Sequence, residues 1–328
     1  MKEKSMTSVG ILLPHDYRLL SVAAILDVLE AANNIQKATE NEKAFNIGLY
    51  QIAEPGQQIA DSFHGYPVAK IDQENLIDLI LIPSFSTNDM KQTIGKNMAY
   101  IPWLHQQFRQ GAEIGTFCTG AFLLAASGLL NGKVATTHVD ACSAFSTSFP
   151  DVILRGDKTV TQDGRLFTSG GSTSSFHLLL HLVQKYCGRD VAVKIAKIFA
   201  IDMDRHNQSY FSTFQPSRDH NDNIVAMVQQ KIEANYQEAE TIEELIKDIP
   251  SSRRNVLRRF KQITGIPPIE YLQQIRIEAA KKLLEQTNQH MGEVIFSSGY
   301  NDPKAFRRIF RKIVGMTPTA YREKFQSN

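Results

Sequence analysis

The 328-residue sequence has few cysteines and no long apolar segment, and each absence excludes a class of protein. Its cysteines, Cys118, Cys142 and Cys187, are scattered and odd in number, which excludes a disulfide framework and a paired zinc motif. No run of about 18 apolar residues occurs, and the apolar stretch near the N-terminus is too short for a signal peptide. We therefore expect a cytoplasmic protein with no membrane partner.

The sequence also lacks a strong overall charge, because 36 basic and 34 acidic residues leave a net charge of +2. The charge is unevenly distributed, however. From Ser251 onward there are 15 Lys and Arg residues against 6 Asp and Glu residues, an excess of +9. The preceding 250 residues carry 21 basic and 28 acidic side chains, or −7. This asymmetry is typical of a basic domain that binds a polyanion beside an acidic domain that does not.

Strand and helix patterns alternate over about the first two hundred residues. The segment 79–82 is continuously apolar, as in a strand buried on both faces. Strands separated by helices predict a parallel α/β sandwich, an arrangement of the flavodoxin-like kind. The expected strands are 9–14, 45–52, 78–83 and 113–117, and the expected helices are 19–33, 101–109 and 120–130, the last closed by a C-cap at Asn131 and Gly132.

This alternation ends near residue 206. The segment 206–222 is polar, contains a proline and shows no apolar period, which predicts a linker. Beyond it the pattern is helical and no strand pattern returns. We therefore predict an α/β domain over residues 1–205, a linker over 206–222 and an all-helical domain over 223–328.

One spacing occurs twice in the helical domain, displaced by about 50 residues. Each copy contains a phenylalanine, a glycine, a proline and a tyrosine at the same intervals. They are Phe260, Gly265, Pro268 and Tyr271 in the first copy, and Phe310, Gly315, Pro318 and Tyr321 in the second. Each copy follows a short apolar helix, a turn and a basic helix. The repeated unit is therefore predicted to be a helix-turn-helix, with short first helices at 242–249 and 291–298 and Gly299 in the second turn.

The basic helices have the properties of DNA-reading helices. Val256, Leu257 and Phe260 form an inward face in the first copy, and Phe306, Ile309 and Phe310 do so in the second. Helices of this diameter fit the major groove, where their N-terminal residues face base edges. A basic helix face is often only solvated surface, but the duplication and the local charge favour DNA binding. The candidate DNA-binding residues, N-caps included, are Ser252, Arg253, Arg254, Asn255, Arg258, Lys261, Asp302, Lys304, Arg307, Arg308 and Arg311.

A helix over 269–284 is expected to join the two units through an apolar face. That face is formed by Ile269, Leu272, Ile275, Ala279 and Leu283. Its length of roughly 24 Å, with the bulk of the flanking units, predicts reading helices about one DNA turn apart, roughly 34 Å.

The segments GYNDPKAFRRIFRKIVGMTPTAYR and IEYLQQIRIEAAKKLLEQT resemble the signature and the linking helix of the AraC/XylS family of transcription regulators. The resemblance covers about 223–325 and implies binding to double-stranded promoter DNA, with RNA polymerase as a candidate partner. The first helix-turn-helix departs from the family at Ile246, where a small alanine is usual. That departure changes packing more than DNA reading.

The segment 113–122 reads as a strand, a sharp turn and a helix, with Cys118 at the turn. This is the pattern of a nucleophile elbow, and the helix N-terminus that follows is expected to favour a thiolate. His138 comes twenty residues later, within reach of the sulfur in such a fold.

These features resemble the DJ-1/PfpI group of the class-I glutamine-amidotransferase-like superfamily. The segments ATTHV and GGSTSSFHLLLHLVQKYCG, with the domain order, resemble the GlxA-like regulators, which fuse such a domain to an AraC-type tail. DJ-1 proteins carry a glutamate that bonds the cysteine, but the corresponding position here falls at about Ser21. Neither Asp16 nor Glu30 matches it. Without that partner nucleophilic chemistry lacks parts, so we expect no enzyme.

The function predicted is a DNA-binding transcription regulator, a homodimer through an N-terminal domain that senses a small metabolite at Cys118, Thr119, Gly120 and His138. The alternatives are a cysteine-dependent hydrolase or glyoxalase-like enzyme, and a redox sensor at Cys118, each with a DNA-binding tail. Cys118 and His138 would be vestigial catalytic residues. His177 and His181 lie one helical turn apart, but no third ligand is evident, so neither a metal nor a cofactor is expected.

Overall fold

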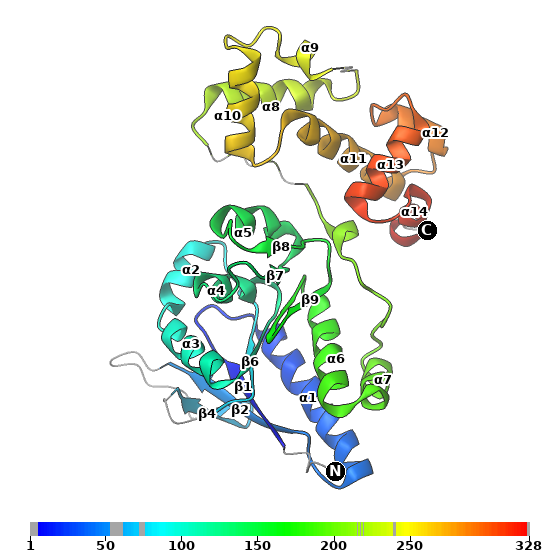
Figure 1. Ribbon diagram of the computed structural model, residues 1–328. Coiled ribbons are helices and arrows are strands. Elements are labelled where there is room, and N and C mark those ends of the chain that lie inside the picture. Colours follow the sequence, from blue (N-terminus) through cyan, green and yellow to red (C-terminus); the bar gives the residue numbers. More distant parts are fainter. Residues whose placement is uncertain are drawn as a thin grey trace. The chain divides into compact units, whose positions relative to one another are not determined.

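The computed structural model describes residues 6–52, 62–71, 76–214, 216, 218, 220–238 and 241–326. It divides the chain into two compact units, Met1–Gln208 and Ser209–Asn328. Figure 1 shows that the first contains the sheet, whereas the described residues of the second form helices and the turns between them. Among the described residues, no helix is both long and apolar enough to span a membrane.

A twisted sheet runs through the first unit. Within the described residues it has eight strands in the order β3-β4-β2-β1-β5-β6-β10-β9. Neighbouring strands are parallel, except that β3 runs antiparallel to β4 and β9 to β10. The strands are β1 (Thr7–Leu12), β2 (Phe45–Gln51), β3 (Ser62–Phe63), β4 (Tyr66–Lys70), β5 (Leu79–Ile82), β6 (Glu113–Thr116), β9 (Val160–Asp163) and β10 (Leu166–Ser169), with β7 (Val134–Ala135) and β8 (Ile153–Leu154) as a separate pair.

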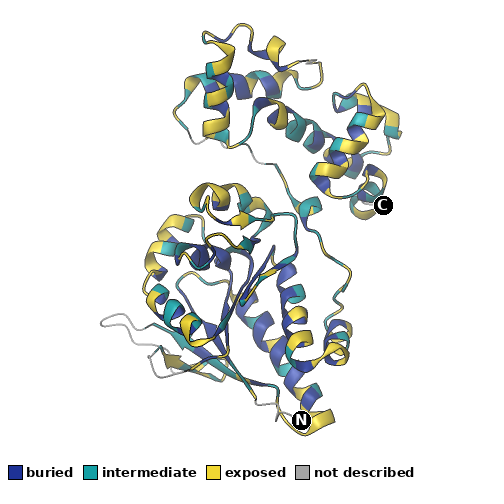
Figure 2. Ribbon diagram, in the orientation of Figure 1, coloured by how far each residue is buried: buried dark blue, intermediate teal, exposed yellow. Residues whose placement is uncertain are grey.

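Helices cover both faces of this sheet (Figure 1). One face carries α1 (Leu19–Glu40), α6 (Ser174–Cys187) and α7 (Arg189–Ile198). The other carries α2 (Met90–Asn97), α3 (Tyr100–Gln110), α4 (Ala121–Ala126) and α5 (Cys142–Ser148). All four residues of β5 are fully buried between the two layers, as the apolar segment predicted (Figure 2). The predicted α/β sandwich is confirmed.

Two helix ends were predicted wrongly. Helix α1 was expected to stop near Asn33, but it continues to Glu40, because the Asn33 side chain exchanges two hydrogen bonds with the Phe45 backbone of β2 (2.8 and 2.9 Å). Helix α4 was expected to reach Leu130, but it ends at Ala126. The Ser127 hydroxyl donates to the Leu124 carbonyl (2.6 Å), which leaves Asn131 and Gly132 in the turns beyond.

The second unit contains a duplicated helical arrangement (Figure 1). A short 3-10 turn, η3 (Ser209–Phe211), precedes the helices. The helices are α8 (Asn223–Asn235), α9 (Ile242–Ile246), α10 (Arg253–Thr264), α11 (Pro268–Gln286), α12 (Met291–Ser297), α13 (Pro303–Val314) and α14 (Pro318–Phe325). One core lies among α8, α9, α10 and the start of α11, and a second among the rest of α11, α12, α13 and α14.

Helix α11 does not have the single apolar face that the sequence predicted. Tyr271 and Leu272 enter the first core, whereas Ile277, Ala280 and Leu284 enter the second. Of the expected face, Leu272 is buried, Ile275, Ala279 and Leu283 are half-buried, and Ile269 is 48% exposed. The buried side of the helix shifts along its length, because each half packs against a different helix-turn-helix.

The predicted linker is divided between the two units. His206, Asn207 and Gln208 belong to the first unit, where the Gln208 N–H donates to the Asp157 carbonyl (2.9 Å) and the Gln208 side chain is buried. Phe211 packs against Phe325 in the second unit, with ring centroids 5.9 Å apart. Side chains from the segment predicted to be a linker therefore take part in the packing of each unit.

Candidate nucleic-acid interface and sensing site

Helix α10 presents a basic outer face on an apolar inner one. It begins after Ser252, whose hydroxyl accepts a bond from the Asn255 N–H (3.4 Å), and ends at Gly265, a left-handed residue with φ +78°. Val256 and Phe260 are buried, as predicted, and Leu257 is half-buried. The predicted DNA-binding residues of this helix are exposed, apart from the half-buried Asn255, and comprise Ser252, Arg253, Arg254, Arg258 and Lys261.

Helix α13 repeats that arrangement. The Asp302 carboxylate accepts a bond from the Lys304 N–H (2.8 Å), and the helix ends at Gly315 with φ +82°. Phe306 and Phe310 are fully buried in the second core. The predicted DNA-binding side chains here are all exposed, namely Asp302, Lys304, Arg307, Arg308 and Arg311.

Most of these cations are not neutralised within the protein. Among the described residues, no carboxylate forms an ion pair with Arg254, Arg307 or Arg311. Arg253 pairs with Glu243, but both side chains are more than half exposed, so this pair is weak in water and open to exchange. The two helices therefore expose cationic surface that is available to phosphates and base edges.

Arg259, the remaining basic residue of α10 and not among the candidates, is paired within the protein. Its guanidinium pairs with the Asp222 carboxylate at 2.8 Å, and the Asp222 side chain is only 12% exposed. Asp222 also caps α8 by accepting bonds from the N–H groups of Ile224 and Val225. Arg259 therefore holds α10 to α8 and does not extend the exposed face.

A hollow of about 860 Å³ beside α13 adds residues that the sequence analysis did not identify. Its lining combines Arg307, Arg308 and Arg311 with further residues, Met291, Lys312, Thr317, Pro318 and Thr319. Thr317 caps α14 by accepting a bond from the Ala320 N–H (3.2 Å). A helix N-terminus beside several cations suits a phosphate group. The sequence could have indicated this helix N-terminus, because Thr317 and Pro318 are an N-cap followed by a first-turn proline.

In the first unit Cys118 occupies the predicted strained turn. It follows β6 with φ +53°, a left-handed conformation that is uncommon for a residue with a side chain. Gly120 then lies so close to β5 that a Cβ atom there would be 2.6 Å from the Pro83 carbonyl oxygen. The Thr119 hydroxyl accepts a bond from the Phe85 N–H (2.9 Å). The elbow is therefore fixed against the carboxyl end of β5.

The thiol of Cys118 does not have the predicted thiolate character. Burial raises the pKa of Cys118 to about 11, and the opposing bonds from Thr119 and the charge of Arg18 do not compensate. The side chain is 4% exposed. The expectation that the helix N-terminus favours the anion is wrong here, because the cost of desolvation is larger.

Asp16, one of the two carboxylates considered as partners of Cys118, is engaged elsewhere. Asp16 accepts bonds from the Thr93 hydroxyl (2.9 Å) and the Lys96 ammonium (3.2 Å), which hold the pKa of Asp16 below its usual value. Ser21, at the position expected for the glutamate, is buried, and its hydroxyl accepts a bond from the Ser84 N–H (3.1 Å).

His138 is partly exposed and does not bond the Cys118 sulfur. Its Nδ1 accepts a bond from the Asp140 N–H (3.2 Å). The neighbouring Thr137 hydroxyl donates to the Cys118 carbonyl (3.0 Å). The Gln208 amide donates to the Thr137 carbonyl (2.9 Å) and accepts a bond from the Gly171 N–H (2.8 Å). The last residue of the first unit is therefore bonded into the loops around Cys118.

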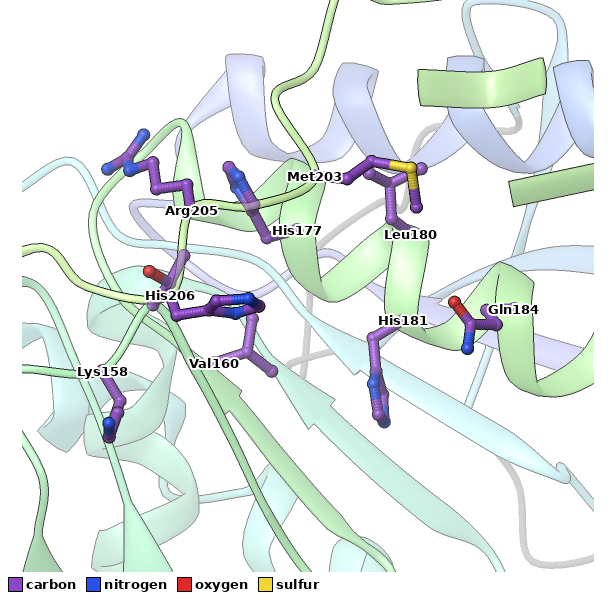
Figure 3. A pocket seen from close by; sticks show the side chains of 10 residues that line it. Lys158, Val160, His177, Leu180, His181, Gln184, Met203, Arg205 and His206 are labelled. Atoms are coloured by element: carbon purple, nitrogen blue, oxygen red, sulfur yellow. The ribbon is translucent and has the colours of Figure 1, made fainter. Parts of the chain in front are cut away.

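The first unit also contains a hollow, of about 410 Å³, beside β9 and α6 (Figure 3). The rings of His181 and His206 lie on either side of it, and Val160 and Leu180 contribute apolar surface. Its wall includes Met203 and Arg205, in the segment that leads toward Gln208. The described residues hold no cluster that would bind a metal. His177 instead bonds the Asp202 carbonyl (2.9 Å), and His181 bonds Gln162 (3.0 Å).

Both units are similar to known proteins. The DJ-1/PfpI family model matches residues 65–185, and a helix-turn-helix domain model matches residues 247–324. The HTH-type transcriptional regulator GbdR of Pseudomonas aeruginosa is 26% identical, over 98% of this chain and 86% of its own length. GlxA of Rhizobium meliloti, also named an HTH-type transcriptional regulator, is 23% identical over 98% and 97%. The structure of Drosophila melanogaster DJ-1beta is 18% identical and covers 60% of this chain and all of its own, with a TM-score of 0.47.

Proposed function

We propose that this chain, whose two units are similar to the DJ-1/PfpI family and to a helix-turn-helix domain, is a sequence-specific DNA-binding transcription regulator that senses a small metabolite. The single observation that carries the proposal is the repeated exposed basic face. In both copies arginines project outward from a helix whose opposite side is buried in its own core. Such a helix enters a major groove without unfolding anything.

Residues at different positions along each reading helix contact different parts of the DNA. Residues near the start of each reading helix, such as Arg254 and Lys304, face base edges. Residues farther along, such as Lys261 and Arg311, face phosphates and set the salt dependence of binding. Lys312 and the N-terminus of α14 supply a further phosphate contact in the hollow beside α13. RNA polymerase is a proposed partner of the bound protein.

We place metabolite sensing at the carboxyl end of the sheet, where ligands bind in open α/β folds. Cys118 and Thr119 lie at the end of β6, and His138 lies nearby on the loop that holds the Cys118 carbonyl through Thr137. Gly120 contributes close packing against β5. Gln208 bonds the same loops immediately before the second unit begins, so a ligand that shifts them also shifts the start of the connection to the DNA-binding unit.

Neither alternative that uses Cys118 chemically is favoured. A hydrolase or glyoxalase-like enzyme needs a thiolate and a base, whereas this thiol is buried and its pKa is raised to about 11. Oxidation also begins from the thiolate, which disfavours a redox switch at this residue. Cys118 therefore serves as a neutral, tightly packed residue of the sensing site. We further propose a cytoplasmic homodimer that associates through the first unit.

The experiment that tests this function reverses one charge on each reading helix. Arg254→Glu and Arg307→Glu should each lower affinity for an operator selected from random duplexes with the unaltered protein by at least about 100-fold, because each places a carboxylate against the duplex. Fluorescence anisotropy at physiological salt measures the effect. Lys282→Glu, an exposed charge reversal on α11, is the matched control and should have little effect. Unchanged binding by both variants would refute the assignment of α10 and α13.

A further inference from the structure

Helix α11 passes from one helix-turn-helix core to the other, and Arg276 lies at the point of transfer. Tyr271 and Leu272 enter the first core before it, and Ile277 enters the second immediately after it. A single helix shared by two separate cores transmits any bend or twist between them. The relative position of α10 and α13 therefore depends on what else connects the two halves.

Arg276 supplies one such connection. Its Nε–H donates to the Tyr236 carbonyl (2.7 Å), at the end of α8 in the first half. Its guanidinium also lies over the Tyr300 ring in the second half, 5.3 Å from the centroid. Tyr300 is 7% exposed and packs edge-on against Phe306, the first buried phenylalanine of α13. One side chain therefore links the end of α8 to the base of the second reading helix.

The turn before α13 approaches the same carbonyl directly. Gly299 has φ +86°, and a Cβ atom there would be 2.6 Å from the Tyr236 oxygen and 2.8 Å from the Arg276 Nε. The Gln237 amide donates to the Ser297 carbonyl (2.8 Å) on the same turn. Contact of this kind requires glycine, because any side chain would separate the two halves. The two helix-turn-helix units are thus joined at α11 and again at this contact.

We propose that Arg276 is a positioning residue that sets the spacing between the two reading helices, and with it the spacing of the two DNA half-sites that the protein accepts. It does so without touching DNA, by joining Tyr236 to Tyr300. The inference rests on the proposed DNA-binding function. Two rigidly connected readers lose contacts when the half-sites move apart, whereas two loosely connected readers adjust at an entropic cost.

The test measures half-site spacing preference in the full chain. An operator is first selected from random duplexes with the unaltered protein, and versions with one base pair inserted or deleted between the half-sites are then made. One base pair moves a half-site by about 3.4 Å and rotates it by about 35°. The unaltered protein should lose on the order of 10-fold in affinity, comparable to a mismatched base pair.

Arg276→Ala should bind the selected operator somewhat more weakly but distinguish the three spacings by less than about 3-fold. Gln237→Ala, which removes one bond from an exposed residue, should shift the preference in the same direction by a smaller amount. Lys282→Ala removes a charge from the same helix away from this contact, and its spacing preference should match that of the unaltered protein. Arg276→Lys should recover part of the preference.

The outcomes separate the inference from the function beneath it. If no two-part operator is selected, the proposed mode of DNA binding fails. If the unaltered protein distinguishes spacings and Arg276→Ala distinguishes them equally well, the role of Arg276 is refuted while DNA binding stands. Equal weakening at all spacings in Arg276→Ala would likewise refute it, because that is the result of a general loss of stability.

Discussion

At the residue scale, desolvation and local pairing decide which side chains are chemically available. Arg254 and Arg307 are exposed and have no carboxylate partner in the described part of the chain, whereas Arg259 is paired with Asp222. Cys118 has the left-handed backbone conformation of a nucleophile elbow. Its thiol is nevertheless protonated at neutral pH, because burial raises its pKa. The strained turn and the buried thiol together favour a structural residue in a sensing site.

Cys118 should be alkylated slowly in the folded protein. With a pKa of about 11, the thiolate fraction at pH 8 is about one in a thousand, so iodoacetamide should react at least about 100-fold more slowly than with a free cysteine. The rate should rise about tenfold with each pH unit and level off only above about pH 11. Peptide mass spectrometry follows Cys118 separately from Cys142 and Cys187, and Cys118→Ser identifies the peptide. Rapid modification at pH 7 would support the enzyme or redox alternatives instead.

The residue-scale predictions from sequence succeeded where local pattern suffices. The inward phenylalanines and outward arginines of the reading helices follow from helical periodicity, and the elbow at Cys118 follows from its flanking strand and helix. The raised pKa of Cys118 does not follow from a local pattern, because it depends on how deeply the packed domain encloses the sulfur. Arg276 was equally beyond reach, since its partners lie 40 and 24 residues away in the chain.

At the element scale, the sequence predicted the duplicated reading helices correctly, but it did not predict the packing of α11 or the end of α1. The two copies share capped reading helices that end at left-handed glycines, Gly265 and Gly315. Helix α11 broke the pattern because a single-face prediction assumes one core, and this helix serves two. Helix α1 continues beyond its predicted end because the side chain of Asn33, a residue that often ends a helix, is hydrogen-bonded to the backbone of β2.

Asp222 is predicted to stabilise the first helix-turn-helix. Although burial raises its pKa, bonds from the Val225 N–H and the Arg259 guanidinium leave the pKa below its ordinary value. A lowered pKa means that the stabilisation is present at neutral pH and is lost as the pH falls below about 4. Asp222→Ala should cost about 1–2 kcal/mol of unfolding free energy at pH 7, as expected for an N-cap.

Thermal unfolding of the full chain, monitored by circular dichroism at several pH values, measures this effect. Asp248→Ala removes an exposed carboxylate whose contact with Lys231 is long (3.4 Å), and it should change the melting temperature little. A difference between Asp222→Ala and the unaltered protein that persists unchanged at pH 2 would contradict an origin in the charged carboxylate.

At the scale of the whole molecule, the proposed sensing site and the proposed DNA-reading helices lie in different units. The first unit bonds its last residue, Gln208, into the loops around Cys118, and the second unit carries the two basic helices α10 and α13. The sequence predicted both classes of domain, because strand–helix alternation and a 50-residue repeat are properties of long segments. It placed the boundary a few residues early, because the burial of Gln208 depends on contacts with Thr137, Gly156 and Gly171.

The most direct test is methylation interference on the selected operator, which reports contacts with guanine N7 in the major groove and with adenine N3 in the minor groove. We predict two segments of interference on one face of the duplex, their centres about 10 base pairs apart. Arg254→Glu should remove one segment and Arg307→Glu the other. A single segment that either variant abolishes, or interference confined to the minor groove, would contradict the claim that α10 and α13 read adjacent turns of DNA.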